Sequence, residues 1–293
     1  MTGLLVVGEV VTDVVARYST PLAPGTDTAA RIRVLPGGAG SNVACWAAHR
    51  GCREVRLLAR AGVADLEWHA KRLRTAGVVP LLVPDDEVPT ATVVALVDAT
   101  AERTFLTDSG AVLRLCPADW SASMLDGVGH LHLSGYLFFS DTSRAAALSA
   151  MTAARGRGVP VSVDPASTGF IAELGVERLL SVLDGVDVLL PNADEARLLT
   201  GLPDPAEAAA KLSRLVPLAV VTLGARGALL AEAGRVTARL PPCAAEALDT
   251  TGAGDAFTGA FLAARLAGAD AAAAAEEGCR AGAEAVGRTG GRP

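Results

Sequence analysis

The stretch from Asp249 to Phe261 reads DTTGAGDAFTGAF and places a glycine-rich loop directly before a run of helix-forming residues. Gly252, Ala253 and Gly254 are small enough for consecutive backbone N–H groups to converge on one anion at the start of that helix. Asp255 then falls in the first turn, where the helix dipole favours a carboxylate. An anion-binding loop beside a carboxylate suits phosphoryl transfer to an alcohol. The structural alternative is an acidic residue that stabilises a helix start after a tight turn.

Two further glycine-rich stretches follow apolar segments, LPGGAGSNVA at 35–44 and VVTLGARGALL at 220–230. None of the three contains the GxxxxGK[ST] pattern of a P-loop, and the two lysines, Lys71 and Lys211, lie outside them. The GxGxxG fingerprint of dinucleotide-binding proteins and the GxSxG turn of α/β-hydrolases are also missing. The sequence therefore excludes three common classes of α/β protein.

Short apolar segments alternate with longer segments of helical period along most of the chain. Several of the apolar segments lack polar alternation, which is typical of strands buried on both faces of a parallel sheet. The alternation predicts an α/β fold with a doubly wound, mostly parallel sheet flanked by helices. The expected strands are 4–7, 130–133, 160–163, 186–190 and 219–222, and the expected helices are 41–49, 66–76, 145–157, 206–215, 253–266 and 271–286.

Two segments interrupt this alternation, within about 10–36 and 90–107. They carry strand-like residues such as TATVVALV, joined by turn residues rather than by helices. We expect them to form extra antiparallel strands that stand off the main sheet as a small lid. No linker rich in Pro, Gly and Ser divides the chain, so residues 1–293 are expected to form a single domain.

The amino-acid composition limits the classes of partner that this chain is expected to bind. The chain has 293 residues, of which 51% are hydrophobic, and a formal net charge of −6, which argues against nucleic acid as a partner. No run of about 18 uncharged apolar residues occurs, so we expect no membrane span and no membrane partner. The five cysteines form no CxxC pair and no secretory signal is evident, which predicts a cytoplasmic protein with reduced thiols. His130 and His132 share one strand face, where ordinary packing is favoured over metal binding.

DTTGAGDAFTGAF closely matches the C-terminal signature of the ribokinase-like carbohydrate kinases, also called the PfkB family, and GGAGSNVA matches the N-terminal one. PNADEARLLTG resembles the family's Asn-x-x-Glu segment, and VVTLGARGALL resembles its nucleotide-binding strand and loop. The motifs stand in the family's order, and the resemblance runs nearly end to end. It implies a ribokinase-like fold and an ATP-dependent kinase that phosphorylates a primary hydroxyl of a furanose sugar or a nucleoside. It also implies a homodimer, because lid strands in this family often pair across a two-fold axis.

The resemblance implies a role for each matching residue. Asp255 would be the catalytic base, and an ordinary Asp carboxyl, with a pKa of about 3.9, is ionised at neutral pH. Asn192 and Glu195 would organise Mg²⁺ near the phosphates, often through water, although the same pair is typical of a capping box at a helix start. The implied residues are Gly252, Ala253 and Gly254 for the anion hole; Asp13, Gly38, Asn42, Ser134 and Asp255 for the substrate; Asn192, Thr222, Gly224, Gly227 and Gly254 for ATP; and Asp249, Thr251, Ala285, Arg288 and Gly290 for an activating K⁺.

The substrate side leaves alternatives open. Ser134 stands about where strict ribokinases carry an acidic sugar contact, so the stretch is more like that of members acting on nucleosides, fructose-type sugars or keto-deoxy sugar acids. Arg103 would suit the carboxylate of a sugar acid and is otherwise a solvated strand residue. A same-fold kinase for a hydroxymethyl-pyrimidine or pyridoxal-type alcohol is a further alternative, which Asp13 disfavours. An alternative of another class is a non-catalytic sensor of sugar or nucleotide, which the intact loop ending at Asp255 disfavours.

Overall fold

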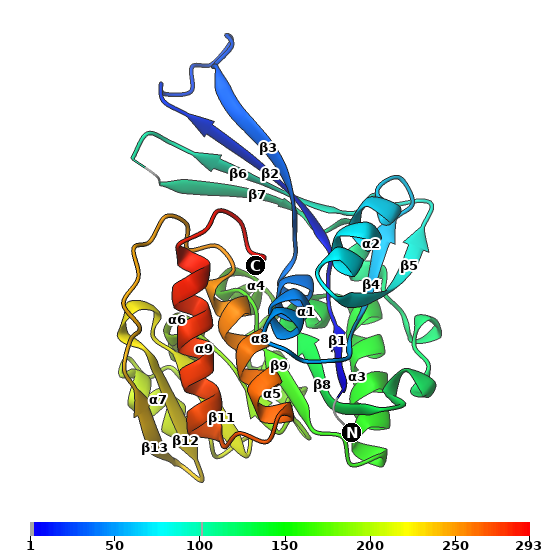
Figure 1. The fold of residues 1–293 in the computed structure, drawn as a ribbon, viewed down its shortest axis with the longest axis vertical. Coiled ribbons are helices and arrows are strands. Elements are labelled where there is room, and N and C mark those ends of the chain that lie inside the picture. Colours follow the sequence, from blue (N-terminus) through cyan, green and yellow to red (C-terminus); the bar gives the residue numbers. More distant parts are fainter. Residues whose placement is uncertain (1–2, 101) are drawn as a thin grey trace.

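The computed structural model describes residues 3–100 and 102–293, and the side chain of Arg103 lies outside the description. The strands of its main sheet are β1 (Gly3–Val7), β4 (Val55–Gly62), β5 (Val78–Asp85), β8 (Val128–Ser134), β9 (Val161–Asp164), β10 (Val188–Leu189), β11 (Leu218–Thr222), β12 (Ala228–Glu232) and β13 (Arg235–Leu240). Their order across the sheet is β13-β12-β11-β10-β9-β8-β1-β4-β5 (Figure 1). Neighbours from β11 to β5 pair in parallel, while β12 and β13 extend the sheet as an antiparallel edge.

Helices lie on both sides of this sheet (Figure 1). They are α1 (Ala39–His49), α2 (Leu66–Thr75), α3 (Asp141–Gly156), α4 (Thr168–Leu174), α5 (Val176–Ser181), α6 (Ala193–Thr200), α7 (Pro205–Leu212), α8 (Ala253–Leu266) and α9 (Ala271–Val286). Within the described chain, no helix combines the length and the hydropathy that a membrane span requires.

Strand β1 shows how the sheet builds two cores from one apolar segment. Leu5 and Val7 belong to a core with residues of α3, α6 and α7. Leu4 and Val6 point the other way and belong to a core with residues of α1, α8 and α9. All four side chains are essentially inaccessible to water, and each such burial contributes roughly 1.5–3 kcal/mol. A strand buried on both faces therefore needs the unbroken apolar run that the sequence has there.

The predicted fold class is confirmed. Helices α8 and α9 have the predicted bounds, and the predicted strands coincide with β1, β8, β9, β10 and β11 to within two residues at each end. Strands β4, β5, β12 and β13 were not predicted from the sequence. In β4, VRLLARAG, two arginines interrupt the apolar pattern because their guanidinium groups reach out to neighbouring carbonyl and carboxylate oxygens.

A second sheet of four strands stands off the first, as the sequence predicts, and we call it the lid (Figure 1). Its strands are β2 (Val11–Tyr18), β3 (Ala30–Gly37), β6 (Ala91–Val97) and β7 (Arg103–Asp108), in the order β3-β2-β6-β7. The prediction of antiparallel strands is correct for the β2–β3 and β6–β7 hairpins and wrong for their junction, where β2 and β6 pair in parallel. The two hairpins come from separate parts of the chain, so the parallel ladder joins them side by side. Exposed apolar side chains, including Ile32, Val34 and Leu106, remain on the lid.

Two buried histidines share one hydroxyl group in the main sheet. His130 Nε2 lies 2.8 Å and His132 Nδ1 lies 2.9 Å from Ser162 Oγ on the neighbouring strand. Burial lowers the pKa of His130 to about 4 and that of His132 to about 3. Both rings are therefore neutral in the folded protein, and they pack as strand residues bonded to Ser162.

We predict that this pair makes the fold sensitive to acid. Because both folded-state pKa values lie below the unfolded value of about 6.5, protonation favours the unfolded chain, so stability falls as the pH drops from about 6.5 towards 4. Each histidine contributes a slope of up to about 1.4 kcal/mol per pH unit. Urea unfolding at pH 7, 6, 5 and 4 should show a shallower decline for His132→Gln than for the wild type. The matched control, His49→Gln at an exposed position, should keep the wild-type slope; equal slopes in all three proteins would contradict the assignment.

Candidate active site

Polar side chains gather where the parallel strands end. Glu9 follows β1, Ser134 ends β8, Asp164 ends β9, Asn192 follows β10 and Thr222 ends β11. In doubly wound sheets the carboxyl edge of the strands is where ligands bind, because the loops there diverge and leave room. A cavity of about 540 Å³ lies at this edge, and its walls include residues of the lid and of the start of α8.

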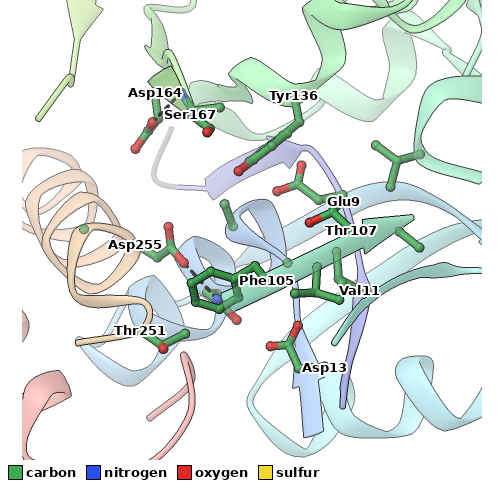
Figure 2. A pocket seen from close by; sticks show the side chains of 18 of the residues that line it. Glu9, Val11, Asp13, Phe105, Thr107, Tyr136, Asp164, Ser167, Thr251 and Asp255 are labelled. Atoms are coloured by element: carbon green, nitrogen blue, oxygen red, sulfur yellow. Dashed lines mark hydrogen bonds between the residues drawn. The ribbon is translucent and has the colours of Figure 1, made fainter. Parts of the chain in front are cut away.

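The lid presents alternate side chains to this cavity. Along β2 the lining residues are Val11, Asp13 and Val15, as expected for a strand whose successive side chains point to opposite faces. Phe105 on β7 pairs in register with Ala95 of β6 and lines the same wall. Figure 2 shows the carboxyl groups of Glu9, Asp13, Asp164 and Asp255 around one space, which Phe105 also lines.

Most of the residues singled out from the sequence meet here. Those that line the cavity are Asp13, Gly38, Asn42, Asn192, Glu195, Thr222, Asp249, Thr251, Gly254, Asp255 and Gly290. The other predicted site residues do not line the cavity. Ser134 is buried beside Gly8 and Glu9, and Gly252 and Ala253 form the start of α8. Gly224 and Gly227 lie in the β11–β12 turn, and Ala285 and Arg288 lie at the end of α9.

Asp255 is held at the N-terminus of α8, one turn from a tight glycine bend. Gly252 is the residue before the helix and adopts φ 74°, a left-handed conformation, and a Cβ there would overlap Gly291. Asn42 Nδ2 donates a hydrogen bond of 2.8 Å to Asp255 Oδ2. The first turn leaves backbone N–H groups without intrahelical acceptors, so the helix start can receive an anion.

The protonation of Asp255 corrects the expectation of an ordinary carboxyl. Burial raises the pKa of Asp255 to about 8, against the lowering effect of the Asn42 hydrogen bond, and the charges of Asp164, Glu9 and Asp13 raise it further. With a pKa of about 8, Asp255 in the protein alone therefore holds its proton at neutral pH. A cation bound in the cavity would oppose these effects and favour the carboxylate.

Asp13 faces Asp255 from the lid side of the cavity. Burial raises the pKa of Asp13 to about 6, while the charge of Arg292 lowers it and that of Asp249 raises it. An ionised carboxylate in this position can accept two hydrogen bonds from neighbouring hydroxyl groups of a ligand. Asn42 offers amide groups from the start of α1, on the adjoining part of the wall.

Asn192 and Glu195 form the capping box that the sequence allows. Asn192 Oδ1 accepts from the N–H groups of Asp194 and Glu195, and the backbone N–H of Asn192 donates to Glu195 Oε2 at 2.8 Å. Glu195 is nevertheless buried at the cavity wall, and burial raises its pKa to about 7, with the charges of Asp194 and Asp255 adding to the rise. The pair therefore serves the helix start and also places a carboxyl group at the cavity.

Asp164 is a cavity residue that the sequence analysis missed. Burial and the charge of Glu195 raise its pKa well above the usual range, and its Oδ1 accepts the N–H of Ala166 at 2.9 Å. The available signal was an aspartate directly after the apolar strand, in SVDPAS. Glu9, directly after β1 in VVGEVV, is a second such residue.

The carboxyl groups of the cavity suit a metal ion that takes only some of its ligands from the protein and the others from water or phosphate. The described residues contain no cluster of three or more acidic, histidine or cysteine side chains able to hold a metal alone. Asp164 and Glu195 both line the cavity, however, and burial and the charge of Glu195 raise the pKa of Asp164. Mg²⁺ prefers one or two carboxylates together with water and phosphate oxygens, which this donor set provides for.

The segments expected to bind nucleotide and potassium adopt defined turns. In TLGARG the chain makes a hairpin between β11 and β12, with Leu223 N–H bonded to Gly227 O at 2.8 Å, and Thr222 lines the cavity. The Asp249 carboxylate accepts the N–H of Thr251 at 2.9 Å and that of Gly290 at 3.2 Å. The carbonyl of Ala285 already accepts the N–H of Arg288 at 3.0 Å.

Aromatic rings form the remaining wall. Phe139 and Phe170 stack with ring centroids 5.1 Å apart, and Tyr136 meets both rings edge to face. All three line the cavity, opposite the half-exposed Phe105 of the lid. Burial raises the pKa of Tyr136, and the charges of Glu9 and Asp255 raise it further, so this aromatic wall adjoins the carboxyl groups.

Comparison with known proteins identifies one family for the whole chain. The model of the pfkB family of carbohydrate kinases matches residues 1–293. A 2-dehydro-3-deoxygluconokinase of Thermoproteus tenax is 35% identical over 161 residues, which are 54% of this chain and 49% of the relative. The chain spans about half the length of the curated relatives it matches first.

Solved structures match across nearly the whole chain. An adenosine kinase from Sinorhizobium meliloti has a TM-score of 0.89 at 24% identity, covering 100% of this chain and 96% of the other. An E. coli protein assigned as a ribokinase II, solved with ATP and Mg²⁺, has a TM-score of 0.88 at 24% identity and covers 99% of this chain and 94% of the other. At these identities the structures support the fold.

We predict that Asp255→Asn stabilises the folded protein at alkaline pH. Because the folded-state pKa of about 8 lies above the unfolded value, ionisation of Asp255 costs stability as the pH rises through this range, and the amide removes that cost. Thermal unfolding should show a gain of several degrees at pH 9 and almost none at pH 4, since 1 kcal/mol is worth about 2–4 °C in a chain of this order of size. Asp184→Asn, at an exposed position, is the matched control and should show no pH-dependent gain. A loss of stability at pH 9 in Asp255→Asn would contradict the burial argument.

Proposed function

The chain belongs to the pfkB family of carbohydrate kinases, and on this basis we propose that it transfers a phosphoryl group from ATP to a primary hydroxyl of a furanose sugar or a nucleoside. The observation that carries the proposal is the position of Asp255. Its carboxyl lies at the N-terminus of α8 and is bonded to Asn42, in the same cavity as Asp13. A base, an anion-binding helix start and a hydroxyl-binding wall are thus within one site.

The proposed step uses this chain's own groups. Asp13 and Asn42 hold the acceptor by its hydroxyl groups, so that one primary hydroxyl lies at Asp255. As that oxygen attacks the phosphorus, its O–H bond breaks and the proton passes to the Asp255 carboxylate. The bond from phosphorus to the departing ADP oxygen breaks in the same step. Backbone N–H groups at the start of α8, where Gly254 lines the cavity, stabilise the charge on the transferred group.

ATP and Mg²⁺ are proposed as the second substrate and its metal. The E. coli ribokinase II structure contains both, and the same fold here offers Asn192, Thr222 and Gly254 on the cavity. Glu195 and Asp164 are the carboxyl groups that would face Mg²⁺ through water or phosphate oxygens. The ion would supply positive charge that lowers the pKa of Asp255 and neutralises the phosphates. A K⁺ ion beside Asp249, Thr251 and Gly290 is proposed as an activator.

The cavity walls favour an acceptor that carries a flat apolar group, as a nucleoside does. Tyr136, Phe139 and Phe170 line one side, and Phe105 lies on the lid. Among the described side chains that line the cavity, none belongs to arginine or lysine. A keto-deoxy sugar acid, the substrate class in the name of the Thermoproteus tenax relative, would need such a cation for its carboxylate. Arg103 would be its partner, and that side chain lies outside the described residues.

The proposal also covers the domain organisation, the oligomeric state and the cellular location of the protein. We propose that the main sheet and the lid act together as one kinase domain, since both line a single cavity. A second copy of the chain is the proposed partner at the lid, where Ile32, Val34 and Leu106 are exposed. A cytoplasmic site of action is proposed because the sequence shows scattered cysteines without a paired pattern.

The test is ADP release by the purified protein with Mg·ATP and K⁺ across a panel of acceptors. The panel contains D-ribose, D-fructose, 2-keto-3-deoxygluconate, adenosine, pseudouridine and pyridoxal. We expect the strongest response with a nucleoside, and loss of at least about a thousandfold in kcat for Asp255→Asn, since acid–base and positioning effects are removed together. Tight binding of a panel member to the wild type without ADP release would support the non-catalytic sensor. Wild-type turnover by Asp255→Asn would refute the assigned base.

We predict that Phe105 contributes to acceptor binding and not to ATP binding. Stacking of a base on an aromatic ring is worth roughly 1–3 kcal/mol, so Phe105→Ala should raise KM for the nucleoside about 5- to 100-fold. The KM for ATP should change less than about twofold, because Phe105 lies on the lid wall. Thr104→Ala, the preceding residue on the same strand and also exposed, is the matched control and should leave both KM values unchanged. Equal rises in KM for the two variants would contradict a stacking role.

A further inference from the structure

The segment Gly290–Arg292 passes between the two glycine motifs and contacts both. Gly290 N–H donates to Asp249 Oδ2 at 3.2 Å, beside the anion loop. Gly291 O accepts the indole N–H of Trp46, a buried residue of α1, at 3.0 Å. A Cβ at Gly291 would overlap the side-chain amide of Asn42, so only glycine fits at this close approach. The segment therefore packs directly against Asn42, the residue that is hydrogen-bonded to the proposed base, Asp255.

Arg292 directs its guanidinium group onto the loop before α1. Its Nη2 donates to Gly37 O at 3.1 Å and to Ser41 Oγ at 2.8 Å, and its Nε donates to Asn42 Oδ1 at 3.4 Å. The Nη1 atom is buried and has no hydrogen-bond partner among the described residues. Burial lowers the pKa of Arg292, but a guanidinium group remains charged under all ordinary conditions. A buried cation is thus fixed against the substrate-side wall of the cavity.

This contact determines which way the Asn42 amide faces. An arginine side chain has only donors, so the atom of Asn42 that meets Arg292 must be the oxygen. The amide nitrogen then faces Asp255, where its N–H can donate to the carboxylate. If the amide were reversed, its oxygen would lie against Asp255 and would be compatible only with the protonated carboxyl.

We propose that Arg292 is a positioning residue that acts through Asn42, holding the amide in the orientation that stabilises the Asp255 carboxylate. The inference rests on the proposed function in one respect: it takes Asp255 to be the group that accepts the proton. It adds a residue that none of the sequence motifs contains. Arg292 does not line the cavity and so does not touch the substrate itself.

The effect of the Asn42 amide on the pKa of Asp255 has to be distinguished from the effects of the charged groups that surround Asp255. Asp13, Glu9 and Asp164 face Asp255 from β2, from the end of β1 and from the end of β9, and all three raise its pKa. Glu195 faces it from α6. The Asn42 hydrogen bond is the interaction that lowers the pKa of Asp255. Loss of the amide orientation therefore leaves only groups that oppose ionisation.

The test compares Arg292→Met, which keeps the length of the side chain and removes its donors, with Arg292→Lys and with Arg280→Met. Arg280 is an exposed arginine of α9, paired with Glu277, and serves as the matched control. In a profile of kcat/KM against pH, Arg292→Met should move the acid limb to higher pH. The resulting loss is about tenfold at pH 7 and much smaller at pH 9, as expected for one hydrogen bond to a charged group. Arg292→Lys should recover part of the loss, and Arg280→Met should match the wild type.

A double-mutant cycle shows whether Arg292 acts through Asn42. In an Asn42→Ala background, adding Arg292→Met should move the acid limb far less than it does in the wild type, because no amide remains to orient. The charge of Arg292 on Asp13 is lost in both backgrounds, so its effect cancels in the comparison. An equal loss at every pH, or a full effect of Arg292→Met in the Asn42→Ala background, would overturn the proposal. Thermal melts of each variant show whether the protein is folded at the assay temperature. If Arg292→Met is unfolded there, Arg292→Lys is compared with the wild type in its place.

A measurement without turnover separates this inference from the proposed function. The ¹³C resonance of the Asp255 carboxyl group, identified by its loss in Asp255→Asn, is titrated in the ligand-free protein. Arg292→Met should raise the titration midpoint, and Arg280→Met should leave it in place. If no acceptor is phosphorylated but the midpoint moves, the proposed function fails and the positioning role stands. If turnover is found and the midpoint does not move, the positioning role fails.

Discussion

A hydrogen bond from Asn42 to Asp255 joins two parts of the chain that are 213 residues apart, and the geometry of the cavity depends on it. Asn42 belongs to the first glycine motif and lies at the start of α1, while Asp255 belongs to the second and lies at the start of α8. The two helices pack against the same face of the main sheet, in one core. Neither motif is a site by itself. The bond brings a wall that can bind hydroxyl groups together with a helix start that can bind an anion.

The second determinant of the cavity is repulsion between carboxyl groups. Asp13, Asp164, Glu195 and Asp255 enter from the lid, from β9, from α6 and from α8, and burial raises the pKa of each. A folded protein tolerates such crowding at neutral pH by keeping protons on some of these groups. A cationic ligand, such as the proposed Mg²⁺, would release those protons and relieve the crowding that costs stability. The charge of Arg292, buried behind the wall, acts in the same direction on Asp13.

The sequence predicted those features that follow from local patterns. The apolar runs predicted β1 and β11, and the loop before Asp255 predicted the start of α8, because both depend on residues close together in the chain. The pKa of Asp255 was not predictable in this way, since it depends on burial of the carboxyl group and on the charges of Asp164, Glu9 and Asp13, which folding brings together. Arg292 was missed for the same reason: its contacts lie some 250 positions away, at Gly37, Ser41 and Asn42. The prediction of antiparallel pairing was wrong for β2 and β6, because turn residues reveal hairpins but say nothing about how two hairpins join.

That parallel ladder also bears on how the chain folds. Val11 pairs with Ala91, and the intervening chain includes β4, α2 and β5, two strands and a helix of the main unit. Each hairpin of the lid can form from neighbouring residues, but the ladder between them closes a long loop, whose entropy must be lost first. Docking of β4 and β5 beside β1 brings the two hairpins near each other. We therefore expect the lid to form late in folding, coupled to docking of the β4–β5 edge.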